Sequence, residues 1–337
     1  MGTTLTRAAS RTRAATGRPT LVWLRPPLLV VGIITLVIGV SGGLARIGWA
    51  TPLIRPSHAA WHAAIMIGGF FGTVISLERA VALNQSWAFL APLASALAAV
   101  TLWLGSPWPW PAWLQAMAAA LLTVATLTVH VRQAALHTAM LVVASGCWLG
   151  GCLAWALLGS IEPAIAPWIA FLVLTIASER LELSRMAPRS ARAGTLFGTY
   201  AAVTVGGAAA FVIFPTAARL LLGMGFCTLT AWLFQHDVAR RTVSQSGLTR
   251  FVAIALLSGY VWLGVGGALI AVTSIFLPGF LLVAGVLPFW SRLASIPAAG
   301  CAVAGVNAAV VGVLGAALYD PIWVSAVKSP ADLAIAI

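Results

Sequence analysis

The stretch LLVVGIITLVIGV, residues 28–40, contains no charged residue, and its one polar side chain is that of Thr35. It lacks the alternation of apolar and polar residues that is typical of a strand in a membrane β-barrel. With its neighbours the run approaches the roughly 20 residues that cross a bilayer as a helix. A helix also gives every backbone N–H and C=O an internal partner, which the hydrocarbon core requires. The stretch therefore predicts a transmembrane helix.

The composition extends this prediction to most of the chain. Of 337 residues, 61% are hydrophobic and 8% are charged, and the mean hydropathy is +1.00. A soluble domain could not bury so much apolar surface in one core. The net charge of +12 would suggest nucleic acid in a soluble protein, but here the predicted partner is the lipid bilayer and not nucleic acid. We expect an all-α, polytopic bundle of about eleven helices, within a range of ten to twelve.

The apolar segments lie near residues 27–45, 58–78, 87–105, 111–129, 137–158, 164–179, 194–214, 217–235, 251–273, 277–290 and 298–318. The tenth is short and contains Pro288, which suggests a half-span or a re-entrant segment. Residues 1–26 are predicted to be a basic cytoplasmic tail, residues 27–320 the transmembrane domain, and residues 321–337 a C-terminal tail.

The basic residues predict the orientation. With a cytoplasmic N-terminus, fifteen of the nineteen Lys and Arg residues fall on the cytoplasmic side, as the positive-inside rule requires. The preference for Arg over Lys and the many Ala residues suggest a GC-rich bacterium. We therefore expect a multi-pass protein of the bacterial inner membrane.

Three pairs of motifs suggest an internal repeat. SLER (76–79) is echoed by ASER (177–180), HVRQ (130–133) by HDVAR (236–240), and SGCWLGG (145–151) by SGYVWLGVGG (258–267). The pairs keep the same order and a similar offset, which favours a unit of four helices used more than once. The predicted units cover about 27–133, 134–241 and 248–320. The third has no counterpart of the SLER ending.

Two histidines lead the second segment, in HAAWHAAIM (58–66). On one helix His58 and His62 share a face, and Met66 continues it. His58 and Met66 would stand about 12 Å apart along the axis, so a metal would use His62 with one of them. Such pairs suit copper or haem iron. The alternatives are a water-facing His58 with a helix–helix hydrogen bond at His62, or a proton relay. Ala59 and Ala63 exclude the HExxH metalloprotease motif.

Charged residues cluster where the second and sixth segments end. They are Glu78, Arg79, Glu179, Arg180, Glu182 and Arg185. Glu179 and Glu182 share a helix face, and Glu182 can pair with Arg185. Helix ends are inexpensive places for charge, so these residues are interpreted either as ion pairs that join helix ends or as a proton-entry site. No residue is identified as catalytic, and whether the protein is an enzyme stays open.

HAAIMIGGFFGTVISLERAVAL (62–83), together with SERLELSR (178–185) and GYVWLGVGG (259–267), resembles the NnrS-like bacterial membrane proteins. These proteins are in turn similar to the catalytic subunit of haem-copper oxidases. The likeness covers about residues 27–273. It implies a protein that is associated with haem or copper and linked to respiration or nitrogen-oxide stress, with His62 as the matching ligand position.

Two other functions stay open. One is a transporter or channel built from internal repeats, and the other is a non-catalytic membrane scaffold. Transport would require ionisable residues or broken helices near mid-membrane, and the sequence shows almost none, which disfavours it. The sequence does not identify a substrate, a protein partner or an oligomeric state.

Overall fold

The computed structural model describes residues 21–49, 56–106, 108–184 and 191–286, together with 295–298, 301, 304–305 and 308–309. Every regular element in these residues is a helix, and none is a strand, which confirms the all-α prediction. Eight of the helices are long and apolar enough to cross a membrane. The chain is therefore a multi-pass membrane protein. It divides into two units, Met1–Ser274 and Ile275–Ile337, and the packing described below belongs to the first.

The helices are α1 (Arg25–Arg46), α2 (Pro56–Ala60), a π-helix (Ala64–Gly72), α3 (Thr73–Leu83), α4 (Leu90–Leu104), α5 (Trp110–Arg132), α6 (Leu136–Leu158), α7 (Glu162–Leu183), α8 (Ala191–Ala210), α9 (Pro215–His236), α10 (Ala239–Thr242) and α11 (Gly247–Val286), with short 3-10 turns at Val22–Leu24 and Ser86–Phe89.

The first nine predicted segments each correspond to helical structure. α8 ends at Ala210, four residues before the predicted end, because the chain turns before Pro215. α11 covers the ninth segment and continues into the tenth, so the two are not separated by a break. Most of the eleventh segment, most of the N-terminal tail and the whole C-terminal tail lie outside the described residues.

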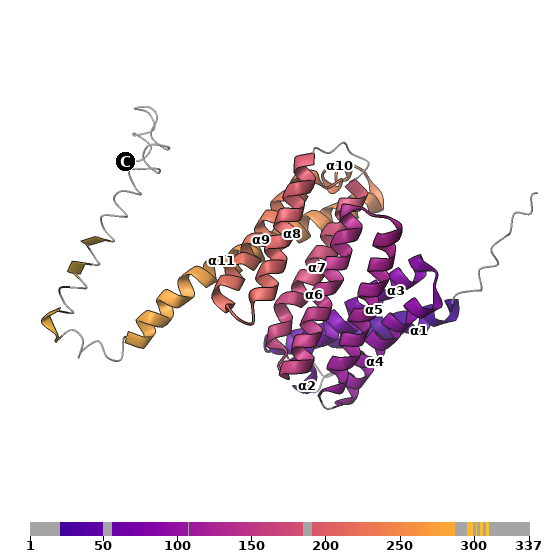
Figure 1. Ribbon diagram of the computed structural model, residues 1–337, viewed down its shortest axis with the longest axis horizontal. Helices are drawn as coiled ribbons and strands as arrows, with labels where there is room; N and C mark the ends of the chain where they lie inside the picture. Colours follow the sequence, from indigo (N-terminus) through magenta and orange to yellow (C-terminus); the bar gives the residue numbers. More distant parts are fainter. Residues whose placement is uncertain are drawn as a thin grey trace, which may run out of the picture. The chain divides into compact units, whose positions relative to one another are not determined.

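Neighbours in the chain are neighbours in the bundle. α4, α5, α6 and α7 pack in chain order, and α8 packs with α9 (Figure 1). Gly105 and Gly159, which end α4 and α6, have φ of +76° and +72°, a left-handed conformation that glycine adopts at little cost. The reversals leave α3, α5, α7 and α9 ending on one side of the bundle. We call this side the arginine end, after Arg79, Arg132, Arg180 and Arg240 there.

The centre of the first unit is built on tryptophans. Trp148, Trp155 and Trp168 are fully buried on α6 and α7. The Trp155 and Trp168 rings meet edge to face, with centroids 5.8 Å apart, and Trp148 stacks on Phe171 at 5.2 Å. Gly151 makes room for Trp168, since a Cβ atom there would lie 2.6 Å from Cδ1 of the indole. This large-on-small packing holds α6 and α7 together.

The second span is not the single α-helix that the spacing of His58, His62 and Met66 assumed. The chain turns at Trp61 after α2, then forms the nine-residue π-helix before α3 begins. The physical reason lies in GGFFG (68–72), because glycines hold an α-helix weakly. They also let neighbouring side chains reach the backbone. Gly69 contacts Thr35 of α1, and Gly72 contacts Trp148.

The motif pairs from the sequence occupy matching places in the fold. SLER and ASER end α3 and α7, and His130 and His236 lie in the last turns of α5 and α9. The third pair lies in α6 and α11. The two members of each pair thus lie on segments that are four positions apart in the order of the long segments. The boundaries of the repeat units themselves stay a prediction.

Candidate functional site

Side chains from neighbouring helices bind the backbone of the π-helix. Gln115 Nε2 donates to the Ala64 carbonyl at 2.9 Å, and Ser95 Oγ donates to the Gly68 carbonyl at 2.5 Å. Thr73 Oγ1 donates to Ser95 Oγ at 3.2 Å, and Ser76 Oγ donates to the Gly72 carbonyl. Gln115, Ser95, Thr73 and Ser76 are at most 1% exposed. We call these four residues the π-helix polar cluster.

The surroundings of the cluster contain two polar atoms without partners. Gln115 Oε1 and Trp148 Nε1 are buried and make no hydrogen bond within the described part of the chain. Both side chains touch π-helix glycines, Gln115 at Gly68 and Trp148 at Gly72. Buried polar atoms are normally paired. A small polar ligand or a water molecule would therefore gain hydrogen bonds here, from one acceptor and one donor.

The two predicted ligand histidines are each bonded to a backbone carbonyl. His62 Nδ1 lies 2.7 Å from the Gly39 oxygen, and His58 Nε2 lies 3.3 Å from the Trp103 oxygen. A carbonyl only accepts, so these ring nitrogens carry the protons. Nε2 of His62 and Nδ1 of His58 are then left with free lone pairs. His58 is 7% exposed, so it is buried and does not face water.

Met66 lies in the π-helix with its thioether against Gly39. The helix–helix hydrogen bond that was one interpretation of His62 is present, since it joins the second span to α1. Among the described residues, no group of three or more His, Cys, Asp or Glu side chains is placed to hold a metal ion. Haem or copper binding at His58, His62 and Met66 stays a prediction.

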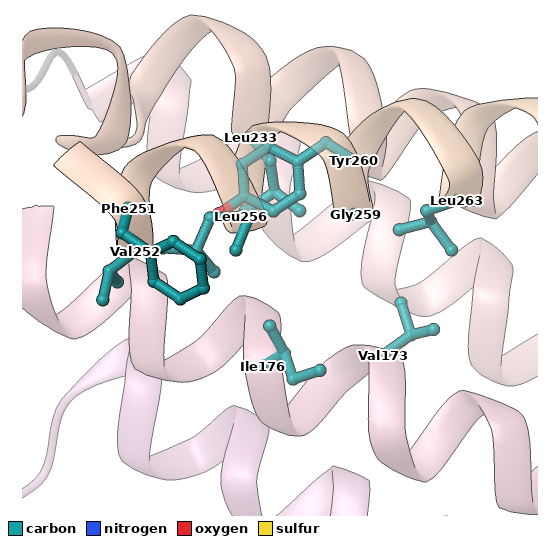
Figure 2. Close-up of a pocket in the computed structure, with 10 residues that line it drawn as sticks. Val173, Ile176, Leu233, Phe251, Val252, Leu256, Gly259, Tyr260 and Leu263 are labelled. Atoms are coloured by element: carbon teal, nitrogen blue, oxygen red, sulfur yellow. The ribbon is translucent and has the colours of Figure 1, made fainter. Parts of the chain in front are cut away.

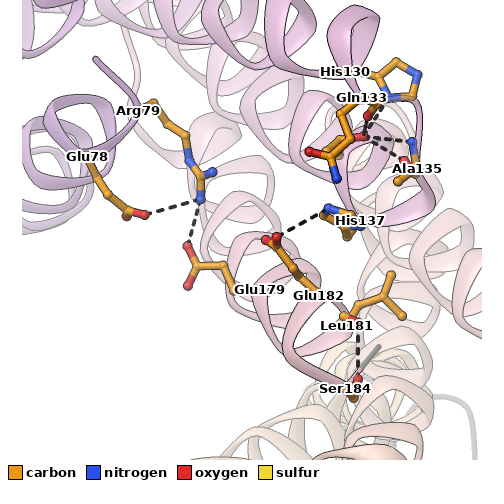
Figure 3. Close-up of polar contacts among 11 residues, drawn as sticks. Glu78, Arg79, His130, Gln133, Ala135, His137, Glu179, Leu181, Glu182 and Ser184 are labelled. Carbon is orange, nitrogen blue, oxygen red and sulfur yellow. Dashed lines mark hydrogen bonds and ion pairs between the residues drawn. The ribbon is translucent and has the colours of Figure 1, made fainter. Parts of the chain in front are cut away.

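The predicted charged residues converge in part at the arginine end (Figure 3). Arg79 Nη2 lies 3.1 Å from Glu179 Oε1 and 3.6 Å from Glu78 Oε1, so it bridges the ends of α3 and α7. The Arg79 side chain is 12% exposed, Glu179 33% and Glu78 60%. This arrangement can lock two helix ends together, as one of the two interpretations proposed.

Glu182 lies beside a histidine. Its Oε1 lies 3.7 Å from Nε2 of His137 at the start of α6, while Arg185, the partner suggested by the sequence, lies outside the described residues. His130 is also held here, with Nδ1 2.8 Å from the Thr138 hydroxyl. Figure 3 shows His137 facing the Glu182 carboxylate and His130 beside Gln133 and Ala135. The arginine end thus joins α3, α5, α6 and α7 through polar side chains.

Arg180 stands apart from the other charged residues. Its Nε is buried without a hydrogen-bond partner, and the guanidinium forms no ion pair within the described residues. Nearby, the carboxylate of Asp237, 4% exposed, accepts a hydrogen bond from the Tyr260 hydroxyl and another from the Ala239 N–H at 3.2 Å. Arg180 and Asp237 line one pocket, about 400 Å³ in volume, beside the start of α11.

The sequence reasoning missed Gln115, Ser95, Trp148 and Asp237. Gln115 had a signal, because it is the one amide side chain in the segment 111–129. Amide and hydroxyl side chains carry no charge, so in an apolar segment they do not indicate a mid-membrane site as an ionisable residue does. Nothing in the local sequence identifies Ser95 or Trp148 as contacts of the π-helix.

Comparisons with known proteins place the chain in a family. A family described as a domain of unknown function (DUF8744) matches residues 25–282. This is more than half of the chain, so the chain belongs to that family. A second family, described as chromate transporter, matches residues 249–337. Neither the curated proteins nor the solved structures contain a match.

Proposed function

We propose that this member of the DUF8744 family is a membrane transporter for a small inorganic oxyanion, of which chromate is the example. The observation that carries the proposal is the π-helix inside the second span, with polar side chains bound to its backbone and two unpaired polar atoms beside it. π-helices occur frequently at functional sites. In transporters, irregular helices inside the membrane form substrate sites.

The substrate class comes from the match of residues 249–337 to the chromate transporter family. The site is compatible with an anion, because the Trp148 N–H, which has no partner among the described residues, can donate to oxygen. The polar groups also continue along the span, from His58 through the cluster to Arg79. The transporter alternative is therefore favoured here over the scaffold.

The test is uptake of chromate, with sulfate as competitor, into liposomes that contain the purified protein. Trp148→Phe removes the unpaired indole N–H and keeps most of the side-chain volume. Losing one hydrogen bond to a charged ligand should lower uptake roughly tenfold. Trp168→Phe is the matched control, since its buried indole N–H is also unpaired but packs against Gly151. Uptake by the unsubstituted protein that does not exceed empty liposomes would refute transport of these ions.

A second candidate function is haem or copper binding of the NnrS-like kind. It is favoured by the hydrogen bond from His62 Nδ1 to the Gly39 carbonyl, because metal-binding histidines commonly donate their other ring N–H to such an acceptor. The purified protein should then show a Soret band or bound copper that is lost in His62→Ala. A colourless, metal-free preparation would remove this candidate.

We also propose that the arginine end faces the cytoplasm of a bacterial cell, with the chain in the inner membrane. The positive-inside rule supports this orientation, because Arg79, Arg132, Arg180 and Arg240 all lie at this end. Cysteines introduced at exposed Ser160 and Ser244 lie beyond opposite ends of the spans. An impermeant maleimide added to intact cells should label the first and spare the second, and the reverse result would invert the orientation.

A further inference from the structure

A cleft runs along one face of α11 between α7 and α9. Its larger part, about 510 Å³, is lined by apolar side chains, among them Val173 and Ile176 of α7, Leu233 of α9, and Leu256 and Leu263 of α11. Figure 2 shows these side chains surrounding an open space between the helices. Gly259 also lines it and has no atom within 4 Å of the position where a Cβ would stand. The cleft is therefore an apolar slot with unfilled room.

The apolar slot continues into the polar pocket beside Arg180. Val252 and Leu256 line both, so the two form one cleft. The polar part carries Arg180, Asp237 and the hydroxyls of Thr242 and Thr249. Its position is at the arginine end, since Arg180 lies in the last turn of α7 and Asp237 follows α9 directly. Lipid headgroups lie at this level of a membrane.

The polar part contains one fixed charge of each sign. Arg180 Nε is buried without a partner among the described residues, so the guanidinium is available for an oxyanion, its preferred partner. The Asp237 carboxylate accepts from Tyr260 and Ala239, and its two oxygens can accept further hydrogen bonds. A ligand that matches both residues carries a negative group and a hydrogen-bonding positive group close together.

We propose that this cleft binds one phosphatidylethanolamine molecule. The phosphate diester pairs with the Arg180 guanidinium, the primary ammonium donates to Asp237, and one acyl chain occupies the apolar slot beside Gly259. Both the shape of the cleft and its charges favour phosphatidylethanolamine. A free inorganic anion would leave the slot empty, and a choline headgroup has no N–H to donate. The proposal is independent of the transport function.

The test measures lipid retained by the full-length protein after detergent purification, by native mass spectrometry, and the thermal midpoint with added lipid. One phosphatidylethanolamine per chain should be retained in preference to phosphatidylglycerol and phosphatidylcholine. Arg180→Gln should weaken retention roughly tenfold, because a charge-assisted hydrogen bond is lost. Its control is Arg250→Gln, an exposed arginine on the first turn of α11 outside the cleft.

A second pair of variants tests the apolar part. Gly259→Leu would fill the slot without touching Arg180, and should lower retention by a similar factor. Gly266→Leu on the same helix also meets open space but does not line the cleft, and retention should not change. Both leucines are better helix formers than glycine, so neither should prevent folding.

Three outcomes would overturn the proposal. Equal retention of all three lipids, unaffected by Arg180→Gln, would mean ordinary bilayer contact. Stabilisation by inorganic phosphate equal to that by the lipid would assign the pocket to a free anion. A change in the mass of the protein assembly in Gly259→Leu, with unchanged lipid content, would assign the slot to a second copy of the chain.

Discussion

The second and sixth spans end in the same Glu-Arg sequence, yet their helices differ. The second passes through a π-helix, whereas α7 is α-helical from Glu162 to Leu183 even though it contains Pro167. The second span has glycines at 68, 69 and 72, and α7 has none. Glycines in the second span let side chains from α1, α4, α5 and α6 reach its backbone. The comparison teaches that two spans with the same ending can differ in the helix that leads to it.

The two endings also differ in their ion pairs. Arg79 of the first predicted repeat meets Glu179 of the second predicted repeat. By the same relation, Arg180 of the second unit would meet a glutamate in the third, but the third unit has no SLER-like ending. Arg180 therefore lies beside the cleft without a carboxylate partner in the described residues. If the predicted repeat holds, its incomplete third copy explains why Arg180 has no carboxylate partner within the described residues.

The largest effect is expected from Gly72→Ala in the π-helix. The added Cβ would lie 2.5 Å from Cζ2 of Trp148, which is fully buried and stacked on Phe171, so neither can move freely. We expect the free energy of unfolding to fall by about 3 kcal/mol, the upper range for overpacking. Denaturant titration of the detergent-purified protein, followed by circular dichroism, measures it. Gly146→Ala on α6 meets no atom within 4 Å, and an equal loss there would contradict the packing argument.

Arg79→Gln and Arg180→Gln compare an arginine that forms ion pairs with one that forms none within the described residues. Without the guanidinium, Glu78 and Glu179 face each other unneutralised, and we expect the free energy of unfolding to fall by about 2 kcal/mol, less than for a fully buried pair. Arg180→Gln removes a cation that has no ion pair within the described part of the chain, so its change should stay within about 0.5 kcal/mol. The same denaturant titration compares them. A larger loss in Arg180→Gln would show that the two endings are equivalent.

Much of the fold followed from the sequence, because a membrane-crossing segment is determined by length and hydrophobicity alone. The first nine segments are present as helices for this reason. The π-helix could not be predicted from the sequence. Its wider turns depend on side chains from other helices that bind its backbone, as Gln115 and Ser95 do. The sequence predicted ion pairs between helix ends, but it did not identify Arg79 and Glu179 as partners. The two residues lie 100 positions apart in the chain. The similarity of SLER and ASER does not show that their side chains are close in space.

Ser95→Ala tests the cross-helix bonds that distinguish the second span. The Ser95 hydroxyl donates to the Gly68 carbonyl and accepts from the Thr73 hydroxyl. Its removal therefore takes one hydrogen bond from each of these two buried groups. We expect a fall of about 1.5 kcal/mol in the free energy of unfolding. Ser178 on α7 is equally buried but donates to the Leu174 carbonyl of its own helix. Ser178→Ala should therefore change stability less, and the opposite order would mean that the bonds to the π-helix do not stabilise it.

The smallest effect is expected from Glu182→Gln, which weakens a contact of the sixth span that has no counterpart in the second. The Glu182 side chain is 40% exposed and lies 3.7 Å from His137. Water screens such a pair, so we expect the free energy of unfolding to fall by only about 0.5 kcal/mol. Glu78→Gln is a useful reference, because Glu78 is more exposed, at 60%, and lies 3.6 Å from Arg79. If either substitution destabilised the protein as much as Arg79→Gln, the arginine end would depend on individual carboxylates, and the central role of the Arg79 bridge would have to be abandoned.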